Sequence, residues 1–477
     1  MASFQDSLPD LTRPAPAAAT GAAVYIETYG CQMNTYDSHA IGGLLEGAGF
    51  RLVDNELAAD AVLLNTCSVR EHAEHKVISR VGELRLRRRE ADLPPAVIGI
   101  CGCMAERLGD DLRKGTRAVD LVVGVDNYDA LSGLLQGLVG PADDDDDDRS
   151  RDGAPRRMKK GGSTVTGHRL DAHYVAPPDL YPVNNSHLVT IHKGCDYKCT
   201  YCIVPMTRGP QSEKAPDVIV AEIEGIVARG GREVTLLGQN VTAYRWQGEL
   251  DFAGLLGQVA AIDGLERIRF LTGHPRDMHR HLIDAIGALR AKVCPWLHVP
   301  AQSGSDTVLR RMKRLYTAGE YLDMVDYARR VIPGVTFSSD FIVGFPGETD
   351  ADFRATLELV RRVQYDQIFS FKYSERPGVP AARLADDVPL EAKKDRLAEL
   401  MDVQQGIWST LADAQVGAVV EAVCEGPARR PAGAWRLRTA NNRKVVVNGP
   451  ELPAGDTFDV RLTGWEGTTF FGERRTA

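Results

Sequence analysis

The 477-residue sequence lacks a long hydrophobic run, and its start lacks the pattern of a secretion signal. No stretch approaches 18 consecutive apolar residues, which excludes a transmembrane helix. Residues 1–20 contain an Ala-rich patch without a basic start followed by an apolar run, so we interpret residues 1–21 as a disordered lead and not as a signal peptide. We therefore expect a cytoplasmic protein that makes no contact with a membrane.

An excess of basic residues is also absent. The formal net charge is -8, and a run of six Asp at Asp143–Asp148 accounts for most of it. The rest of the chain is close to neutral, so bulk charge does not indicate a nucleic-acid-binding protein. Any surface that binds a nucleic acid must be local.

A disulfide framework is not indicated either. The chain has nine cysteines, an odd number, and nothing directs it to an oxidising compartment. Cysteines that occur in closely spaced sets are therefore expected to hold a metal or to take part in chemistry.

Short apolar runs alternate with helical segments in the N-terminal part, which predicts an open parallel α/β domain over residues 22–140. Its helical segments are about Asp37–Ala48 and Glu71–Arg89. The expected strands are Val24–Thr28, Ala61–Asn65, Val97–Ile100 and Leu121–Gly124. Residues 141–180, with an acidic block followed by a basic block, are interpreted as a charged linker.

A second alternation of strands and helices over residues 181–412 predicts a partial (β/α)6 barrel, because six units are too few to close an eight-fold barrel. A helix over about Glu391–Ala414 leads out of this domain. The expected strands are Leu188–His192, Glu233–Leu237, Arg267–Leu271, Trp296–Val299, Thr336–Val343 and Gln367–Tyr373. Residues 413–477 contain short β-rich runs between Gly and Pro, which predicts a small OB-like β-barrel.

Three cysteines lie within eight residues, in His192-Lys-Gly-Cys195-Asp-Tyr-Lys-Cys199-Thr-Tyr-Cys202. Three thiolates on one loop can bind three corners of a cuboidal [4Fe-4S] cluster and leave the fourth iron open. An electron-transfer cluster or a structural zinc would need a fourth ligand, and none follows within the loop.

Three further cysteines, Cys31, Cys67 and Cys103, each follow one of the first three expected strands. The carboxyl ends of parallel strands lie at one edge of a sheet, where ligands bind. We therefore expect these cysteines to converge on an auxiliary [4Fe-4S] cluster that is again one ligand short. Cys101 cannot share the third position with Cys103, and we interpret it as a core thiol at the end of a strand.

These two sets closely resemble the methylthiotransferase family of radical S-adenosylmethionine enzymes, in the subgroup that modifies isopentenylated tRNA. The resemblance covers nearly all of residues 22–475 and includes a C-terminal TRAM domain. It is carried by Thr28-Tyr-Gly-Cys-Gln-Met-Asn34, Asn65-Thr-Cys-Ser-Val-Arg-Glu71, Gly102-Cys-Met-Ala105, Cys199-Thr-Tyr-Cys-Ile-Val-Pro205 and Thr207-Arg-Gly209. One departure is Lys313-Arg-Leu-Tyr316, where the family has Asn-Arg-Gly-Tyr, and a second is Cys101.

The resemblance implies an enzyme that adds a methylthio group to C2 of N6-isopentenyladenosine at position 37 of tRNA, next to the anticodon. It implies two [4Fe-4S] clusters and two S-adenosylmethionine molecules per turnover. The cluster on Cys195, Cys199 and Cys202 cleaves S-adenosylmethionine to a 5′-deoxyadenosyl radical, and the auxiliary cluster supplies sulfur. The implied partners are the tRNA, a reductant such as flavodoxin or ferredoxin, and a donor of sulfur or for cluster repair. We expect a monomer.

Several polar residues are expected to contact S-adenosylmethionine. The resemblance places Tyr201 near the adenine of this cofactor. Polar residues after the barrel strands lie where the chemistry of such barrels occurs and can bind ribose or carboxylate. These residues are Gln239, Asn240, Gln302, Ser303 and Asp340.

The tail carries a candidate RNA-binding surface. Residues 426–450 contain six basic residues and no acidic ones, with Trp435 as a possible stacking partner for a base. The six are Arg429, Arg430, Arg436, Arg438, Arg443 and Lys444.

Other functions remain open from the sequence. Relatives of the family methylthiolate threonylcarbamoyladenosine in tRNA or an aspartate of a ribosomal protein. A non-catalytic iron-sulfur protein that regulates through RNA, or a zinc-dependent RNA-binding module, would carry the same tail. Two sets of three cysteines, each one ligand short, favour the enzyme.

Overall fold

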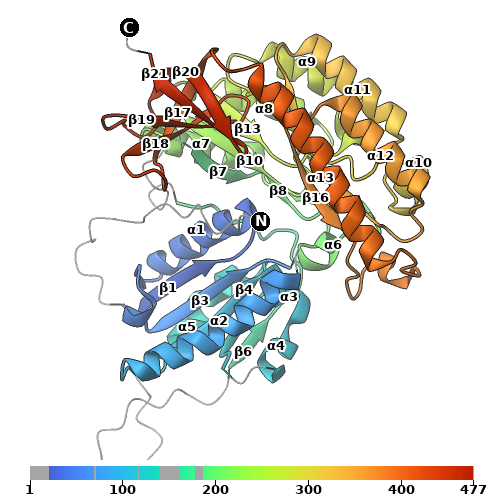
Figure 1. Cartoon of the computed structure of the whole chain (residues 1–477). Coiled ribbons are helices and arrows are strands. Elements are labelled where there is room, and N and C mark those ends of the chain that lie inside the picture. Colours follow the sequence, from blue (N-terminus) through green and yellow to red (C-terminus); the bar gives the residue numbers. More distant parts are fainter. Residues whose placement is uncertain (1–20, 69–70, 116–117, 140–161, 178–185, 476–477) are drawn as a thin grey trace, which may run out of the picture. The chain divides into compact units, whose positions relative to one another are not determined.

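The computed structural model describes residues 21–68, 71–115, 118–139, 162–177 and 186–475, and the expected N-terminal lead lies outside these ranges except for Gly21. The chain divides into two compact units (Figure 1). The first comprises residues 1–182, 193–196 and 203–212, and the second the remaining residues. No helix of the described residues is long and apolar enough to cross a membrane.

A six-stranded, entirely parallel sheet forms the first unit, in the order β2-β1-β3-β4-β5-β6. Its strands are β1 (Ala23–Thr28), β2 (Arg51–Leu52), β3 (Ala61–Thr66), β4 (Val97–Gly102), β5 (Leu121–Val123) and β6 (Ser163–Val165). The chain order reverses at β1, which has β2 on one side and β3 on the other. Such a switch point is where open α/β sheets bind ligands.

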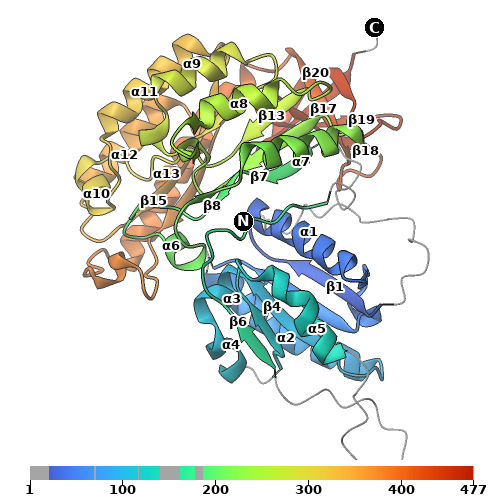
Figure 2. The same cartoon turned by 180° about the vertical axis from the view of Figure 1, so that it is seen from behind.

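Helices cover both faces of this sheet, as the apolar strands predict. They are α1 (Gln32–Gly47), α2 (Glu71–Glu90), α3 (Cys103–Leu108), α4 (Asp110–Gly115) and α5 (Leu131–Val139). Alternate residues of β3 serve the two faces, because Leu63 packs with α1 and α5 whereas Val62 and Leu64 pack with α2. Helices α1 and α5 lie on one face in Figure 2, and α2 and α3 lie on the other in Figure 1.

Two features of the first unit differ from the prediction. Helix α1 begins at Gln32 and not at Asp37, because Cys31 acts as its N-cap and the Asn34 side chain accepts a hydrogen bond from the Cys31 backbone amide. Strand β6 comes from the stretch that the sequence assigns to the linker, and Ser163–Val165 extends the sheet beside β5. Residues 140–161 lie outside the described residues.

The second unit contains the partial (β/α)6 barrel, and each predicted strand is present to within two residues. Its six strands form two parallel three-stranded sheets, β7-β10-β13 and β14-β15-β16, and an isolated parallel bridge between Ile268 and Val293 joins them. The strands are β7 (Ser186–Thr190), β10 (Glu233–Leu237), β13 (Arg267–Phe270), β14 (Trp296–His298), β15 (Thr336–Val343) and β16 (Gln367–Lys372).

Helices alternate with these strands. They are α6 (Val204–Thr207), which belongs to the first unit, α7 (Pro216–Ala228), α8 (Phe252–Ala260), α9 (Arg280–Ala288), α10 (Asp306–Arg311), α11 (Ala318–Val331), α12 (Asp350–Val363) and α13 (Leu390–Asp413). Capping boxes start α11 at Thr317 and α12 at Thr349. The short strands β8 (His192–Lys193) and β9 (Ser212–Glu213) pair with each other, as do β11 (Arg245–Trp246) and β12 (Leu250–Asp251).

The predicted small barrel follows α13 and is closed by five strands in the order β17-β18-β19-β21-β20. They are β17 (Val419–Pro427), β18 (Ala434–Thr439), β19 (Lys444–Asn448), β20 (Thr457–Glu466) and β21 (Thr469–Arg474). The turn between β18 and β19 rests on the amino ends of the (β/α)6 strands. There Asn441 donates to the Gly334 carbonyl at 2.9 Å, and Arg443 binds the Asp366 carboxylate at 2.8 and 3.1 Å.

Candidate functional site: two cysteine sets

The three dispersed cysteines meet at the carboxyl edge of the N-terminal sheet. Cys31 follows β1, Cys67 follows β3 and Cys103 follows β4, so all three leave the same edge of parallel strands. A hydrogen bond with the Cys67 thiol, aided by Arg208, lowers the pKa of the Cys31 thiol to about 6. Cys67 and Cys103 are buried, whereas Cys31 is exposed.

Two glycines make room for this arrangement. Gly102, immediately before Cys103, has φ +91, and a Cβ there would lie 2.5 Å from Asn65 Oδ1 and 2.6 Å from the Thr66 carbonyl oxygen. A Cβ on Gly30 would lie 2.6 Å from the Cβ of Cys67. The loops can approach one another this closely only because both positions lack a side chain.

A buried amide pair fixes the loops that carry Cys31 and Cys67. Asn65 donates to the Asn34 carbonyl at 2.8 Å and to Ser38 Oγ at 2.9 Å, and Asn34 donates back to Asn65 Oδ1 at 3.2 Å. Both asparagines are fully buried. The bonds hold the end of β3 against the first turn of α1, so the positions of the two cysteines depend on each other.

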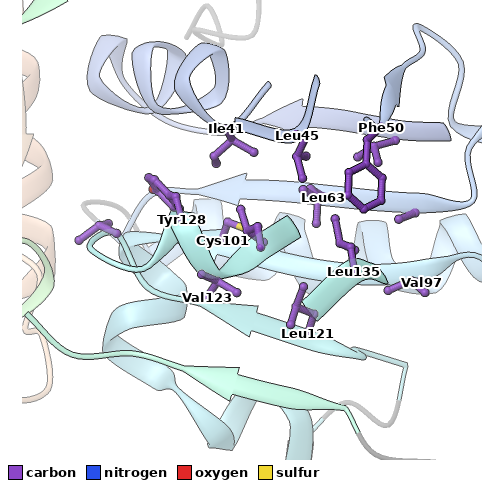
Figure 3. Packing of buried hydrophobic residues seen from close by; sticks show 14 of the residues in the cluster. Ile41, Leu45, Phe50, Leu63, Val97, Cys101, Leu121, Val123, Tyr128 and Leu135 are labelled. Atoms are coloured by element: carbon purple, nitrogen blue, oxygen red, sulfur yellow. The ribbon is translucent and has the colours of Figure 1, made fainter. Parts of the chain in front are cut away.

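Cys101 lies in the core, in agreement with its interpretation as a core thiol. It belongs to β4, is completely buried among the apolar residues between the sheet and helices α1 and α5, and lies beside Val123 in Figure 3. Burial raises the pKa of its thiol to about 12. The other two unassigned cysteines, Cys294 and Cys424, are buried as well.

A buried ion pair lies against the third cysteine of this set. Arg208 donates to Cys103 Sγ at 3.2 Å and to Asp37 Oδ2 at 2.6 Å. Burial raises the pKa of the Cys103 thiol, and the charge of Arg208 opposes that rise. Arg208 belongs to the motif Thr207-Arg-Gly209 that carries part of the resemblance, but no role for its side chain was predicted from the sequence.

The loop Cys195–Cys202 contains the point where the chain passes from the first unit to the second. In the second unit, the Cys202 amide donates to the Cys199 carbonyl at 3.1 Å, which forms a tight turn. Thr200 fastens this turn, because its amide donates to the Met312 carbonyl and its hydroxyl to the Arg311 carbonyl, each at 3.0 Å. The turn is thereby fixed to the end of α10.

A second buried arginine lies against this turn. Arg314 donates to Cys199 Sγ at 3.5 Å, to the Pro300 carbonyl at 2.8 Å and to the Tyr316 hydroxyl at 3.0 Å. Tyr201, next to Cys202, is partly exposed, and burial raises the pKa of its phenol. Arg314 lies in the segment Lys313-Arg-Leu-Tyr316, where the sequence departs from the family pattern.

The expected cofactor contacts after β10 have different surroundings. Gln239 Oε1 is buried with no hydrogen-bond partner among the described residues, so it suits a contact with a bound molecule. Asn240, by contrast, is used within the protein: its amide donates to Asp277 Oδ2 at 2.6 Å and its oxygen accepts from the His274 amide. Tyr197 of the cysteine loop binds the same Asp277 at 2.8 Å.

The contacts expected after β14 and on β15 also differ from one another. Ser303 is fully buried and shares hydrogen bonds with Thr356 and the Ser305 amide, which makes it part of the internal structure. Gln302 has φ +66, and its backbone N–H donates to the Asp340 backbone carbonyl at 2.8 Å. The Asp340 carboxylate lies 3.7 Å from His298 Nε2. A role in cofactor binding stays a prediction for these residues.

The basic tail is less positive than its sequence indicates. Glu425, immediately before residues 426–450, binds both Arg436 at 2.9 Å and Arg438. A third cation, Arg443, pairs with Asp366. These ion pairs offset part of the charge of the basic surface, and a role of its six residues in RNA binding stays a prediction.

The residues present fit iron-sulfur clusters. Each set offers three sulfur donors, the ligand type that such clusters prefer, and each has a buried guanidinium against one sulfur. No group of three or more His, Cys, Asp or Glu close enough for a single metal ion occurs in the described part of the chain. A cuboidal cluster binds its thiolates at separate corners, further apart than the ligands of one ion.

Comparisons with known proteins agree with this arrangement. Residues 23–124 match the model of the uncharacterized protein family UPF0004, and residues 189–360 match that of the radical SAM superfamily. Among solved structures, the radical S-adenosylmethionine methyltransferase TsrM from Kitasatospora setae has a TM-score of 0.54 at 15% identity, covering 76% of this chain and 74% of that one. The cobalamin-dependent radical enzyme OxsB has a TM-score of 0.51 at 10% identity, with 82% and 56% covered. These likenesses show the fold.

Relatives of higher identity extend over nearly the whole chain. The tRNA-2-methylthio-N(6)-dimethylallyladenosine synthase of Acidithiobacillus ferrooxidans is 43% identical over 92% of this chain and 94% of its own length. The synthase of the same name from Carboxydothermus hydrogenoformans is 40% identical, with 94% and 97% covered, and that from Rhodopirellula baltica is 39% identical, with 95% of each covered. The chain therefore belongs to the tRNA-2-methylthio-N(6)-dimethylallyladenosine synthase family of radical SAM proteins.

Proposed function

We propose that this protein is a tRNA methylthiotransferase that adds a methylthio group to C2 of N6-isopentenyladenosine at position 37, next to the anticodon. It uses [4Fe-4S] clusters and S-adenosylmethionine. The observation that carries the proposal is about 40% identity to synthases of this reaction over nearly the full length of the chain.

In this proposal Cys195, Cys199 and Cys202 hold one cluster, and Cys31, Cys67 and Cys103 hold the other. Bound together with S-adenosylmethionine, the first cluster supplies the radical chemistry that an inert C-H bond needs, and the second supplies the sulfur.

The chain's own residues position these groups. Around the auxiliary cluster, the amide pair Asn34 and Asn65 fixes the loops that carry Cys31 and Cys67. Gly102, which has no side chain, lets the loop that carries Cys103 lie close to them. Around the other cluster, Thr200 anchors the turn that contains Cys199. Among the expected cofactor contacts, we propose Gln239 first. Its side-chain oxygen is buried without a hydrogen-bond partner among the described residues, and an unsatisfied buried acceptor costs free energy that a contact with S-adenosylmethionine would offset.

The proposal includes further partners. A low-potential reductant such as flavodoxin or ferredoxin supplies electrons, and a donor replaces the sulfur or repairs the auxiliary cluster. We place the reaction in the cytoplasm, where the tRNA substrate is found, and propose a monomer. On the C-terminal barrel, we propose that the exposed residues Arg429, Arg430 and Lys444 contact RNA phosphates, whereas Arg436, Arg438 and Arg443 share two carboxylates.

Mass spectrometry of nucleosides tests this function. The reconstituted and reduced protein is incubated without oxygen with S-adenosylmethionine and isopentenylated tRNA. We expect a methylthio mass gain on isopentenyladenosine together with 5′-deoxyadenosine. Formation of 5′-deoxyadenosine without the gain would direct the search to threonylcarbamoyladenosine or a ribosomal protein. Neither product, from protein that holds both clusters, would favour a non-catalytic RNA-binding regulator.

A further inference from the structure

Each cysteine set has one buried arginine that donates a hydrogen bond to the sulfur of a proposed ligand. Arg208 is 6% exposed and lies 3.2 Å from Cys103 Sγ. Arg314 is 7% exposed and lies 3.5 Å from Cys199 Sγ. The sequence assigned no role to either arginine.

The two arginines differ in how their charge is balanced. Asp37, 2.6 Å from Arg208 and itself largely buried, neutralises that guanidinium. Arg314 instead donates to the Pro300 carbonyl and the Tyr316 hydroxyl, and its guanidinium carbon lies 5.2 Å from the centre of the Tyr316 ring. No carboxylate among the described residues forms an ion pair with Arg314, so its positive charge is uncompensated within the part of the protein that the structure describes.

The charge of each arginine and its hydrogen bond to sulfur both shift the reduction potential of a thiolate-bound cluster in a known direction. Arginine stays protonated at all accessible pH values. Its charge and its N-H···S hydrogen bond stabilise the more negative, one-electron-reduced cluster, which raises the reduction potential. A neighbouring carboxylate has the opposite effect.

We infer that Arg208 and Arg314 are positioning residues that set the reduction potentials of the two clusters independently, with Asp37 offsetting the effect of Arg208 at the auxiliary cluster alone. This inference rests on the proposed function, because it takes the two cysteine sets as the cluster ligands. It goes beyond that function because it assigns to the protein the means by which two clusters of one type acquire different potentials. The uncompensated Arg314 favours electron uptake at the cluster that must pass an electron to S-adenosylmethionine.

The test measures each cluster by itself in the full-length protein. A C31A/C67A/C103A background retains only the cluster of the radical domain, and a C195A/C199A/C202A background retains only the auxiliary cluster. Iron analysis and electron paramagnetic resonance first check that each background holds one cluster. If either background still held both, the ligand assignment of the proposed function would fail before any arginine is changed.

Redox titration with dithionite, followed by electron paramagnetic resonance, then gives the midpoint potential in each background. We expect Arg314→Gln to lower the potential of the radical-domain cluster, and Arg208→Gln to lower that of the auxiliary cluster. Asp37→Asn should raise the auxiliary potential, since it leaves the charge of Arg208 uncompensated. Arg314→Lys and Arg208→Lys retain the charge and should restore part of each shift.

Arg88 supplies the matched control. It is as buried as the other two, at 6% exposed, and among the described residues it donates only to backbone carbonyls, including those of Pro94 and Ala59. Ala59 precedes β3, so this arginine lies at the amino edge of the sheet, away from the cysteines. Arg88→Gln should therefore lower stability without moving the auxiliary potential.

Three results would overturn the inference. One is an unchanged potential in Arg208→Gln and Arg314→Gln proteins that retain their clusters. Another is an equal shift in Arg88→Gln. The third is a lower or unchanged potential of the auxiliary cluster in Asp37→Asn, which would contradict the role of Arg208. If a glutamine variant fails to retain its cluster, the potentials of the lysine variants and of Asp37→Asn test the inference instead.

Discussion

The two cysteine sets reach similar chemistry by different routes. Cys195, Cys199 and Cys202 lie on one short loop, so the distance along the chain already holds them together. Cys31, Cys67 and Cys103 are far apart in the sequence and meet only because β1, β3 and β4 are parallel neighbours. The first set is therefore a local feature, whereas the second depends on the fold of a whole domain.

The largest expected effect comes from removing one cysteine from each set, because the two losses should affect different products. Both Cys199→Ala and Cys103→Ala should abolish methylthiolation. Only Cys199→Ala should also abolish formation of 5′-deoxyadenosine, because that product needs only the radical-domain cluster. Mass spectrometry of both products measures this. Cys101→Ala, which changes a core thiol two residues from Cys103, is the control and should retain iron at both clusters; loss of the auxiliary cluster in this variant would reverse our choice of Cys103.

A steric change should affect only the set that depends on the fold. Gly102→Ala places a Cβ 2.6 Å from the Thr66 carbonyl oxygen and at φ +91, where a side chain is strained. We expect loss of most of the auxiliary cluster, seen as about half the iron of the wild-type protein, with 5′-deoxyadenosine formation retained. Gly133→Ala on α5, where an added Cβ meets nothing within 4 Å, is the control. Full iron content in Gly102→Ala would show that the loop tolerates displacement.

Destabilising the N-terminal sheet should again affect only the cysteine set that depends on this sheet. Leu63→Ala in β3 removes a fully buried side chain from the core beneath the auxiliary site and should cost about 2–5 kcal/mol. Hydrogen exchange should show weaker protection in β1, β3 and β4 and unchanged protection in the barrel strands β17–β21. Leu236→Ala in β10 is the matched change in the second unit and should weaken protection in β7, β10 and β13 while leaving that of β1, β3 and β4 unchanged. Equal loss of protection everywhere would mean that the chain unfolds as one cooperative body.

The smallest effect concerns pH and the second unit alone. Burial raises the pKa of Glu348 from 4.5 to about 7, against the opposing effects of the Gly344 amide and Arg396. The folded state thus keeps a proton that the unfolded chain releases, so the stabilisation from this group is complete below pH 4.5 and is lost as the pH rises through about 7.

Tryptophan fluorescence during urea unfolding measures this effect, since all five tryptophans lie in the second unit. The stability of wild-type protein relative to Glu348→Gln should fall between pH 4.5 and 7. Glu391→Gln, at the exposed start of α13, is the control. An identical pH slope in the wild-type protein and Glu348→Gln would contradict the raised pKa.

The sequence predicted most of the fold because the buried parallel strands are short apolar runs with helical segments between them. All six strands of the partial barrel and four of the six in the N-terminal sheet were predicted. Strand β2 has only two residues, and β6 is a polar segment after a charged stretch, so neither has an apolar pattern to detect.

Sequence alone identified the candidate cluster ligands, because clusters of this type prefer thiolates and three cysteines in eight residues can reach one cluster when the loop is folded. It also identified Cys101 as a core thiol from its place at the end of a strand. Only the tertiary structure placed Arg208 between Asp37 and Cys103, and Arg314 against Cys199 without a carboxylate. It alone showed that Glu425 and Asp366 form ion pairs with three arginines of the tail. Charge pairing depends on distances between residues remote in sequence, and those distances are set only when the chain folds.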